Sequence, residues 1–196
     1  MTLRSCSFIA CFVAALAVAC ESRNSPPVGP SALQSRDAVA TMATSAQMAA
    51  TAAQHAVALF DACDPDTFNA VIGPGACTRR GGVRFENFVA ELTRHHSVGA
   101  WHFAPSEVTM RVGQLLVANN RGGETHTFTE VDEFGGGNIQ FLNDLVGLTT
   151  VAPECKNAVD IPSGGSSSET EHEAGVEKYQ CCIHPWMRAE VRITEK

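Results

Sequence analysis

The C-terminal part of the chain contains a run of side chains that can bind a soft metal ion, Tyr179-Gln-Cys181-Cys182-Ile-His184-Pro-Trp-Met187. A thiol, an imidazole and a thioether occur within this run, three residues apart from one another. Sulfur ligands favour Cu(I), and imidazole binds both common oxidation states of copper. A loop with this spacing can place Cys181, His184 and Met187 on one ion, and a histidine from elsewhere in the chain would complete the set.

Either of two adjacent cysteines could supply the thiolate, and strand geometry favours Cys181. Side chains alternate between the two faces of a strand, so Tyr179 shares a face with Cys181, whereas Gln180 shares the other face with Cys182. Tyr179 is the side chain expected in the core, which points Cys181 inward as well. Cys182 would also leave a single residue before His184, a tight span for two ligands of one ion.

This motif resembles that of a known family. The stretch Cys181-x-x-His184-Pro-Trp-Met187 is similar to the copper loop of cupredoxins, the family of plastocyanin, pseudoazurin and amicyanin, and its short spacing is most similar to that of amicyanin. Upstream segments resemble the first strands of that fold, namely Phe103-Ala-Pro105, Val108 to Gly113, Asn119 and His126-Thr-Phe. The resemblance covers about residues 99–196 and implies a mainly β fold, a cupredoxin-like Greek-key sandwich or barrel.

Carried over residue by residue, the resemblance implies one type 1 copper ion with four ligands, His126, Cys181, His184 and Met187. It implies an electron carrier rather than an enzyme, with a thiolate and two imidazoles around the metal and a weak axial thioether. The exposed edge of His184 would be the electron port, and Trp186 beside it would offer an apolar surface to a redox protein partner. Several cupredoxins have Asn or Ser after the first histidine to pin the copper loop; Thr127 stands there, which leaves that role open.

Other interpretations of the same residues remain open. The chain could sequester copper without passing electrons, although it lacks Met-rich or His-rich tracts. A second copper ion with enzymatic activity would use His95, His96 and His102, but an Arg-His-His run at a helix end is more often a solvated cap. The C-terminal motif could also be half of a disulfide together with packing residues.

Short strands are predicted to position the ligands in the domain 98–196. The strand-like segments are Val108–Val112, Leu115–Ala118, Thr125–Val131 and Val191–Thr194. Glycine-rich turns separate them, and such a series predicts a β-sandwich or barrel of roughly 100 residues. Ser163–Thr170 is predicted to be a loop, and the glutamates around and after its end to form an acidic strand face or edge.

The preceding segment, residues 37–97, is predicted to be a helical extension. Asp37–Ala62 is rich in alanine, with apolar residues at helical spacing. Asp64-Pro65 is typical of an N-cap followed by proline in the first turn of a short helix, and Phe85–Arg94 is amphipathic. This segment has no counterpart in the cupredoxin core.

The N-terminus indicates export. Residues 1–19 end in an apolar run that is too short to span a bilayer and suits a signal peptide. Small residues before Cys20 resemble the lipobox of bacterial lipoproteins, which implies lipid on Cys20; ordinary cleavage after Ala19 would leave a spare thiol instead. Residues 20–36 then form a flexible tether, and the protein is expected in the periplasm or at the cell surface, anchored to the membrane through the lipid.

The remaining cysteines suit disulfides, which persist outside the cytoplasm. Cys6 and Cys11 leave with the signal peptide, and assigning Cys20 to lipid and Cys181 to copper leaves four: Cys63, Cys77, Cys155 and Cys182. Cys63–Cys77 is the local pairing and Cys155–Cys182 then follows, although three pairings are possible. The net charge of −7 argues against nucleic acid as a partner.

Overall fold

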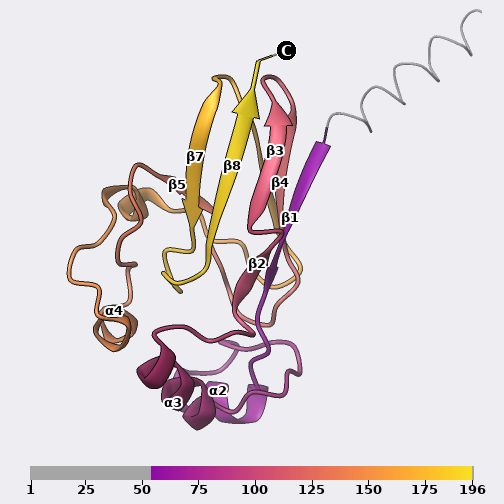
Figure 1. The fold of residues 1–196 in the computed structure, drawn as a ribbon. Helices are drawn as coiled ribbons and strands as arrows, with labels where there is room; N and C mark the ends of the chain where they lie inside the picture. Colours follow the sequence, from indigo (N-terminus) through magenta and orange to yellow (C-terminus); the bar gives the residue numbers. More distant parts are fainter. Residues whose placement is uncertain (1–53, 196) are drawn as a thin grey trace, which may run out of the picture. The chain divides into compact units, whose positions relative to one another are not determined.

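The computed structural model describes residues 54–195, and these form two four-stranded sheets (Figure 1). One sheet has the order β2-β1-β4-β6, built from His102–Ala104, Gln54–Phe60, Leu115–Asn120 and Ser166–Thr170. The other has the order β3-β8-β7-β5, built from Glu107–Arg111, Arg188–Thr194, Gly175–Gln180 and Thr129–Val131. The pairs β1–β4 and β3–β8 are parallel, and the other paired strands are antiparallel. The prediction of a mainly β fold is confirmed.

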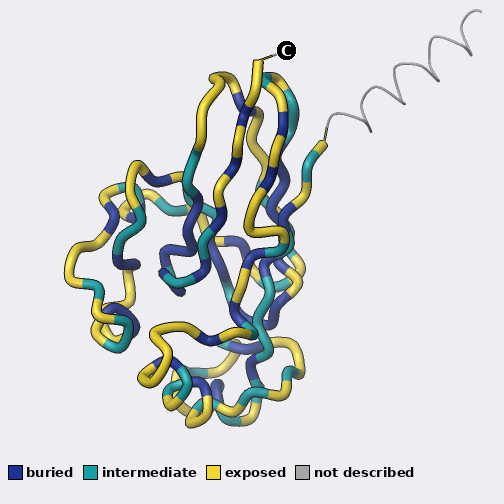
Figure 2. Tube along the Cα trace, viewed as in Figure 1, coloured by how far each residue is buried: buried dark blue, intermediate teal, exposed yellow. Residues whose placement is uncertain are grey.

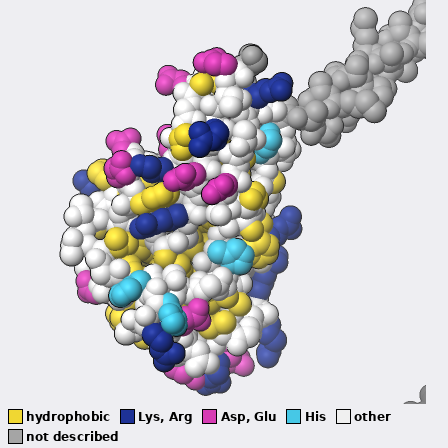
Figure 3. All heavy atoms as spheres, viewed as in Figure 1, with side chains coloured by type: hydrophobic (Ala, Val, Ile, Leu, Met, Phe, Trp, Pro, Cys, Tyr) yellow, Lys and Arg dark blue, Asp and Glu magenta, His cyan; other side chains and the backbone are white. Residues whose placement is uncertain are grey.

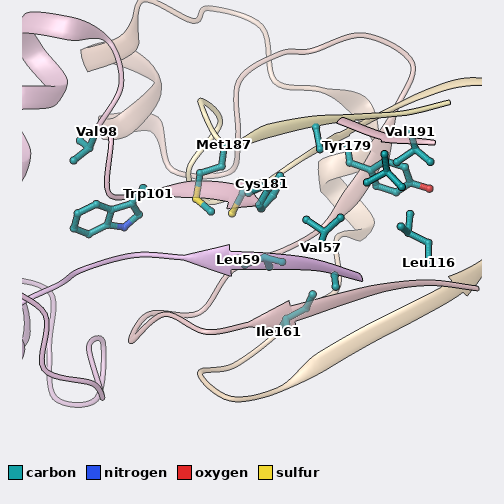
Figure 4. Packing of buried hydrophobic residues seen from close by; sticks show 14 of the residues in the cluster. Val57, Leu59, Val98, Trp101, Leu116, Ile161, Tyr179, Cys181, Met187 and Val191 are labelled. Carbon is teal, nitrogen blue, oxygen red and sulfur yellow. The ribbon is translucent and has the colours of Figure 1, made fainter. Parts of the chain in front are cut away.

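The core lies between the two sheets, where alternate residues of each strand point inward. In β8, Ala189, Val191 and Ile193 are buried, while the residues between them are exposed. In β1, Val57 and Leu59 are completely buried and face this core (Figure 4). Figure 2 shows the same buried stretches along the facing strands of both sheets.

The expected helix over Asp37–Ala62 is wrong where the structure describes it. Gln54–Phe60 is strand β1, paired along its length with β4, so the β-domain begins before residue 98. The alanine-rich composition favours a helix, but the inward pair Val57 and Leu59 has the period of a strand, and packing between the sheets outweighs local propensity. The signal-like residues 1–19, Cys20, the tether 20–36 and the first part of the extension lie outside the described residues.

Two short helices that were predicted from sequence are confirmed. Helix α2 (Pro65–Val71) begins at the N-cap Asp64, whose side chain accepts a hydrogen bond from the N–H of Asp66, and helix α3 (Phe85–His95) follows. Their buried aromatic side chains pack on Trp101, with Phe68 stacked on the indole and Phe88 tilted against it. This cluster of rings holds the helices against one end of the sheets (Figure 1). No helix within residues 54–195 is long and apolar enough to cross a membrane.

Three segments of the β-domain have a secondary structure that the sequence did not predict. Ser166–Thr170 is not a loop but edge strand β6, paired with β4, and only Thr129–Val131 of the segment Thr125–Val131 is a regular strand. Serine-rich sequence is typical of loops, and here an available strand edge overrides that preference. The long connection after β5 contains helix α4 (Gln140–Val146) and the 3₁₀ helix η1 (Pro153–Asn157).

Both disulfides form between the pairs favoured from sequence. Cys63–Cys77 closes the loop around helix α2, and Cys155–Cys182 joins η1 to the loop that follows β7. Within residues 54–195, Cys181 is the one free cysteine, and it is completely buried.

Candidate metal centre

The loop from Cys181 to Met187 connects the antiparallel strands β7 and β8, and its backbone hydrogen bonds fold it into a compact turn. The N–H of Cys181 donates to the carbonyl of Met187 at 3.0 Å, and the N–H of Met187 donates to the carbonyl of His184 at 2.9 Å. Gln180 and Arg188, the residues flanking the loop, are paired across the two strands. The loop therefore returns on itself and brings together the three residues that the sequence motif singled out.

Three of the four proposed ligands converge in the structure. The sulfur of Cys181 lies 3.8 Å from Nδ1 of His126 and 3.7 Å from Nδ1 of His184, and one potential donor atom from each residue lies within 4.8 Å of the others. All three side chains are buried. Metal–sulfur and metal–nitrogen bonds of about 2.3 and 2.0 Å, at the roughly 120° of a trigonal site, would place sulfur and nitrogen about 3.7 Å apart. The separations thus fit a trigonal two-histidine, one-cysteine site.

The environment of Cys181 favours the thiolate form. Two backbone N–H groups, those of Thr127 and His184, point to the sulfur at 3.4 Å. Burial raises the pKa of the Cys181 thiol, but hydrogen bonds from His126 and His184 and the positive charge that these imidazoles can carry lower it well below its usual value. A thiolate is the form of cysteine that binds metal ions.

His126 is oriented by a buried carboxylate. Its Nε2 lies 2.9 Å from Oδ2 of Asp61, whose oxygens also accept the N–H groups of Gly123 and Glu124. Burial alone would raise the pKa of Asp61, but these hydrogen bonds lower it to about 2. Burial likewise lowers the pKa of His126, yet the hydrogen bonds to Asp61 and Cys181 outweigh it and raise the value to about 9. With Nε2 held by Asp61, Nδ1 faces the sulfur, which is the arrangement that second partners impose on metal-binding histidines.

Sequence reasoning missed Asp61. It directly follows β1, the strand that was expected to be part of a helix, so nothing placed it near His126. The alternation of Val57 and Leu59 with less buried residues is typical of a strand, and it could have predicted one here. A carboxylate that immediately follows such a strand lies at the end of a sheet.

The second imidazole, His184, is not exposed as the resemblance implied. Only 2% of it is accessible, and its Nε2 lies 3.5 Å from Oε2 of Glu124 rather than in solvent. The same oxygen accepts a hydrogen bond of 2.7 Å from the indole N–H of Trp101. Trp186, whose ring contacts His184 edge-on, is half-buried against Phe88 of α3. The expectation of an exposed His184 edge is therefore wrong, because the helical segment packs over it.

The remaining ligand candidate and the loop anchor lie at the same centre. Met187 is 1% exposed, and Figure 4 shows its side chain and that of Cys181 directed into the same interior region above Leu59. Thr127 accepts the N–H of Cys182 on its Oγ1 at 2.7 Å. This hydrogen bond ties the loop to the segment that carries His126, so Thr127 performs the pinning role that the sequence left open.

The histidines considered for a second metal site are not brought together. His96 ends helix α3 and faces the carbonyl of Leu145, whereas His102 faces the carbonyl of Gly99 and stacks on Phe60. Histidine side chains appear at separate places on the surface in Figure 3. Across residues 54–195, the other group of potential ligands is Asp61, Cys63 and Glu124, in which Cys63 is committed to a disulfide.

No protein-family model and no curated protein matches the chain. Among solved structures, a purple cupredoxin from Nitrosopumilus maritimus is 20% identical with a TM-score of 0.37, over 50% of this chain and 86% of that one. A methionine-to-alanine variant of amicyanin in the Cu(I) state is 22% identical with a TM-score of 0.33, over 47% of this chain and 73% of that one. Likenesses this distant do not assign a function.

Proposed function

We propose that this chain binds one copper ion as a type 1 site and carries single electrons outside the cytoplasm. The observation that carries the proposal is the buried convergence of the free Cys181 with Nδ1 of His126 and Nδ1 of His184 at 3.7–3.8 Å. Two imidazoles and a thiolate in a trigonal arrangement, with a methionine in the same loop, are the donor set of blue-copper electron-transfer sites. Copper bound there would supply reversible one-electron chemistry between Cu(II) and Cu(I).

The chain's own residues would hold and shield that ion. Cys181 would be the thiolate ligand, supported by the two N–H groups directed at its sulfur. Asp61 would hold Nε2 of His126 and keep its Nδ1 free for the metal. Glu124, whose Oε2 lies 3.5 Å from Nε2 of His184, would do the same for that histidine. Met187 would be a fourth, weaker ligand. Because these groups are already buried and held close together, binding the ion would require little rearrangement of the chain.

Location and partners belong to the same proposal. Lipid on Cys20 would anchor the chain to a membrane, with residues 20–36 as tether, on the periplasmic side or at the cell surface. A redox protein would exchange electrons with the site. The two disulfides support an oxidising compartment, since structural disulfides are rare in the cytoplasm.

Copper titration tests the function. Adding Cu(II) to the metal-free protein is expected to produce an intense visible thiolate-to-copper band at one equivalent, a type 1 electron-spin-resonance signal and reversible voltammetry. Cys181→Ser should abolish the band while the fold, monitored by circular dichroism, is retained. A colourless protein at any copper level would disprove the proposal, and a coloured protein without reversible voltammetry would favour the sequestering alternative.

A further inference from the structure

An apolar cavity of about 300 Å³ opens beside His184. Its walls come from helices α2, α3 and α4 and from the loop between Cys181 and Met187. The large apolar side chains that line it include Phe68, Phe85, Phe88, Ile139, Phe141 and Ile183. Glu124 and His184 are among the few polar side chains that line it. Cavities of roughly 300–1,000 Å³ with apolar walls and a few placed polar groups are typical of small-molecule sites. Its volume, at the lower end of that range, suits a molecule of one or two rings.

Large apolar side chains are left exposed at the opening of this cavity. Ile72, Ile139 and Phe141 are 56%, 42% and 51% exposed, and all three line it. Scattered exposed apolar residues need no explanation, but three that converge on one opening mark an interaction site. They would shield the apolar part of a bound molecule from water.

A carboxylate oxygen of the cavity wall that no described side chain or backbone group donates to indicates what a bound molecule can carry. The side chain of Glu124 is 9% exposed. Its Oε2 accepts the indole N–H of Trp101 and lies near His184, whereas its Oε1 has no hydrogen-bond partner among residues 54–195. This oxygen is not one of the fully buried polar atoms that lack a partner, so a molecule in the cavity that Glu124 lines can reach it. A hydrogen bond to a charged group contributes about 1.5–3 kcal/mol.

We propose that this cavity binds a small aromatic molecule that carries one hydrogen-bond donor, of the phenol or arylamine class. The ring lies among the phenylalanine side chains, where ring–ring contacts add to the burial of apolar area. Its O–H or N–H donates to Oε1 of Glu124. Because His184 lines the same cavity, the bound ring contacts this imidazole. Binding itself requires no copper.

Calorimetric titration of the metal-free protein with two matched probes tests the proposal. We expect para-ethylphenol to bind saturably at one equivalent, and para-ethylanisole, which lacks the donor, to bind at least about tenfold more weakly. The indole N–H resonance of Trp101 should shift with the phenol, because its acceptor Glu124 is shared. Equal affinity for the two probes, or no saturable binding of the phenol, would overturn the proposal.

Two variants locate the binding. Ala76→Phe adds a large side chain at the cavity wall and should reduce the affinity for para-ethylphenol at least about tenfold, whereas Val159→Ala, exposed and not part of the wall, should leave it unchanged. Unchanged affinity in Ala76→Phe would place the ligand elsewhere and contradict the proposal. Since these titrations use metal-free protein, their failure is separate from a failure of copper binding.

Discussion

Two carboxylates buried at opposite ends of β4 differ in pKa because the groups around them differ, although burial acts on both in the same direction. Asp61 lies near the end of β4 at the candidate metal centre, and Glu171 lies beside its beginning, where its backbone pairs with Gln114. Burial favours the neutral form of both. Donors around Asp61 nevertheless lower its pKa to about 2, whereas burial and the charges of Glu177 and Glu169 raise the pKa of Glu171 to about 8.

The two pKa values differ because different numbers of hydrogen-bond donors surround the two carboxylates. At the metal centre every oxygen of Asp61 accepts a hydrogen bond, so a fixed negative charge can orient His126. At the other end Glu171 and Glu177 both accept the hydroxyl of Tyr179, and two carboxylates compete for one donor. The surroundings of Asp61 favour its charged form, and those of Glu171 favour its protonated form.

The largest effect is expected from removing the ordered carboxylate. Asp61→Ala leaves His126 and three backbone N–H groups without their acceptor, and should lower the free energy of unfolding by about 3–5 kcal/mol, as for other broken buried pairs. Asp61→Asn, which keeps the shape, should weaken copper binding about 10–100-fold. Denaturant unfolding and competition with a copper chelator measure the two effects. Asp160→Asn, at an exposed position, is the control, and wild-type affinity in Asp61→Asn would show that His126 orients itself.

The next effect separates the structural cysteine from the metal-binding one. Replacing both Cys155 and Cys182 by serine removes a cross-link across 27 residues, which in the chain-entropy model costs about 3.5 kcal/mol. Because Cys181 is untouched, the visible copper band should persist. Thermal unfolding and absorption spectra of the copper-loaded variant provide the check, and loss of the band with an intact fold would mean that Cys182 takes part in the site.

The smallest effect concerns the opposite end and depends on pH. Between the ordinary value of 4.5 and about 8 the folded protein keeps a proton on Glu171 that the unfolded chain releases, so the free energy of unfolding falls as pH rises through this range. Glu171→Gln should remove this slope and stabilise the protein at pH 8 by on the order of 1 kcal/mol. Urea unfolding at several pH values measures it, with the exposed Glu173→Gln as control. An unchanged slope would assign the proton to another group.

Local sequence was sufficient for the parts of the fold whose signals are local. The N-cap Asp64 and the amphipathic run Phe85–Arg94 mark helices α2 and α3, because capping and a 3.6-residue period act within a few residues. Likewise the three-residue spacing from Cys181 to Met187 is closed by hydrogen bonds inside one hairpin. The strand β1 was missed because its alanine-rich sequence satisfies a helical pattern, and the weak period-two signal of Val57 and Leu59 becomes decisive only through pairing with β4 and β2.

The sequence by itself determined which side chains could bind a metal ion, namely Cys181 and His184 in one short loop and His126 upstream. It also provided four further cysteines for two cross-links. Only the tertiary structure decided their surroundings. Asp61 is 65 residues from His126, and the helices that cover His184 come from a segment about a hundred residues earlier in the chain. Contacts across such distances depend on how whole sheets and helices pack, and no pattern within either segment records them.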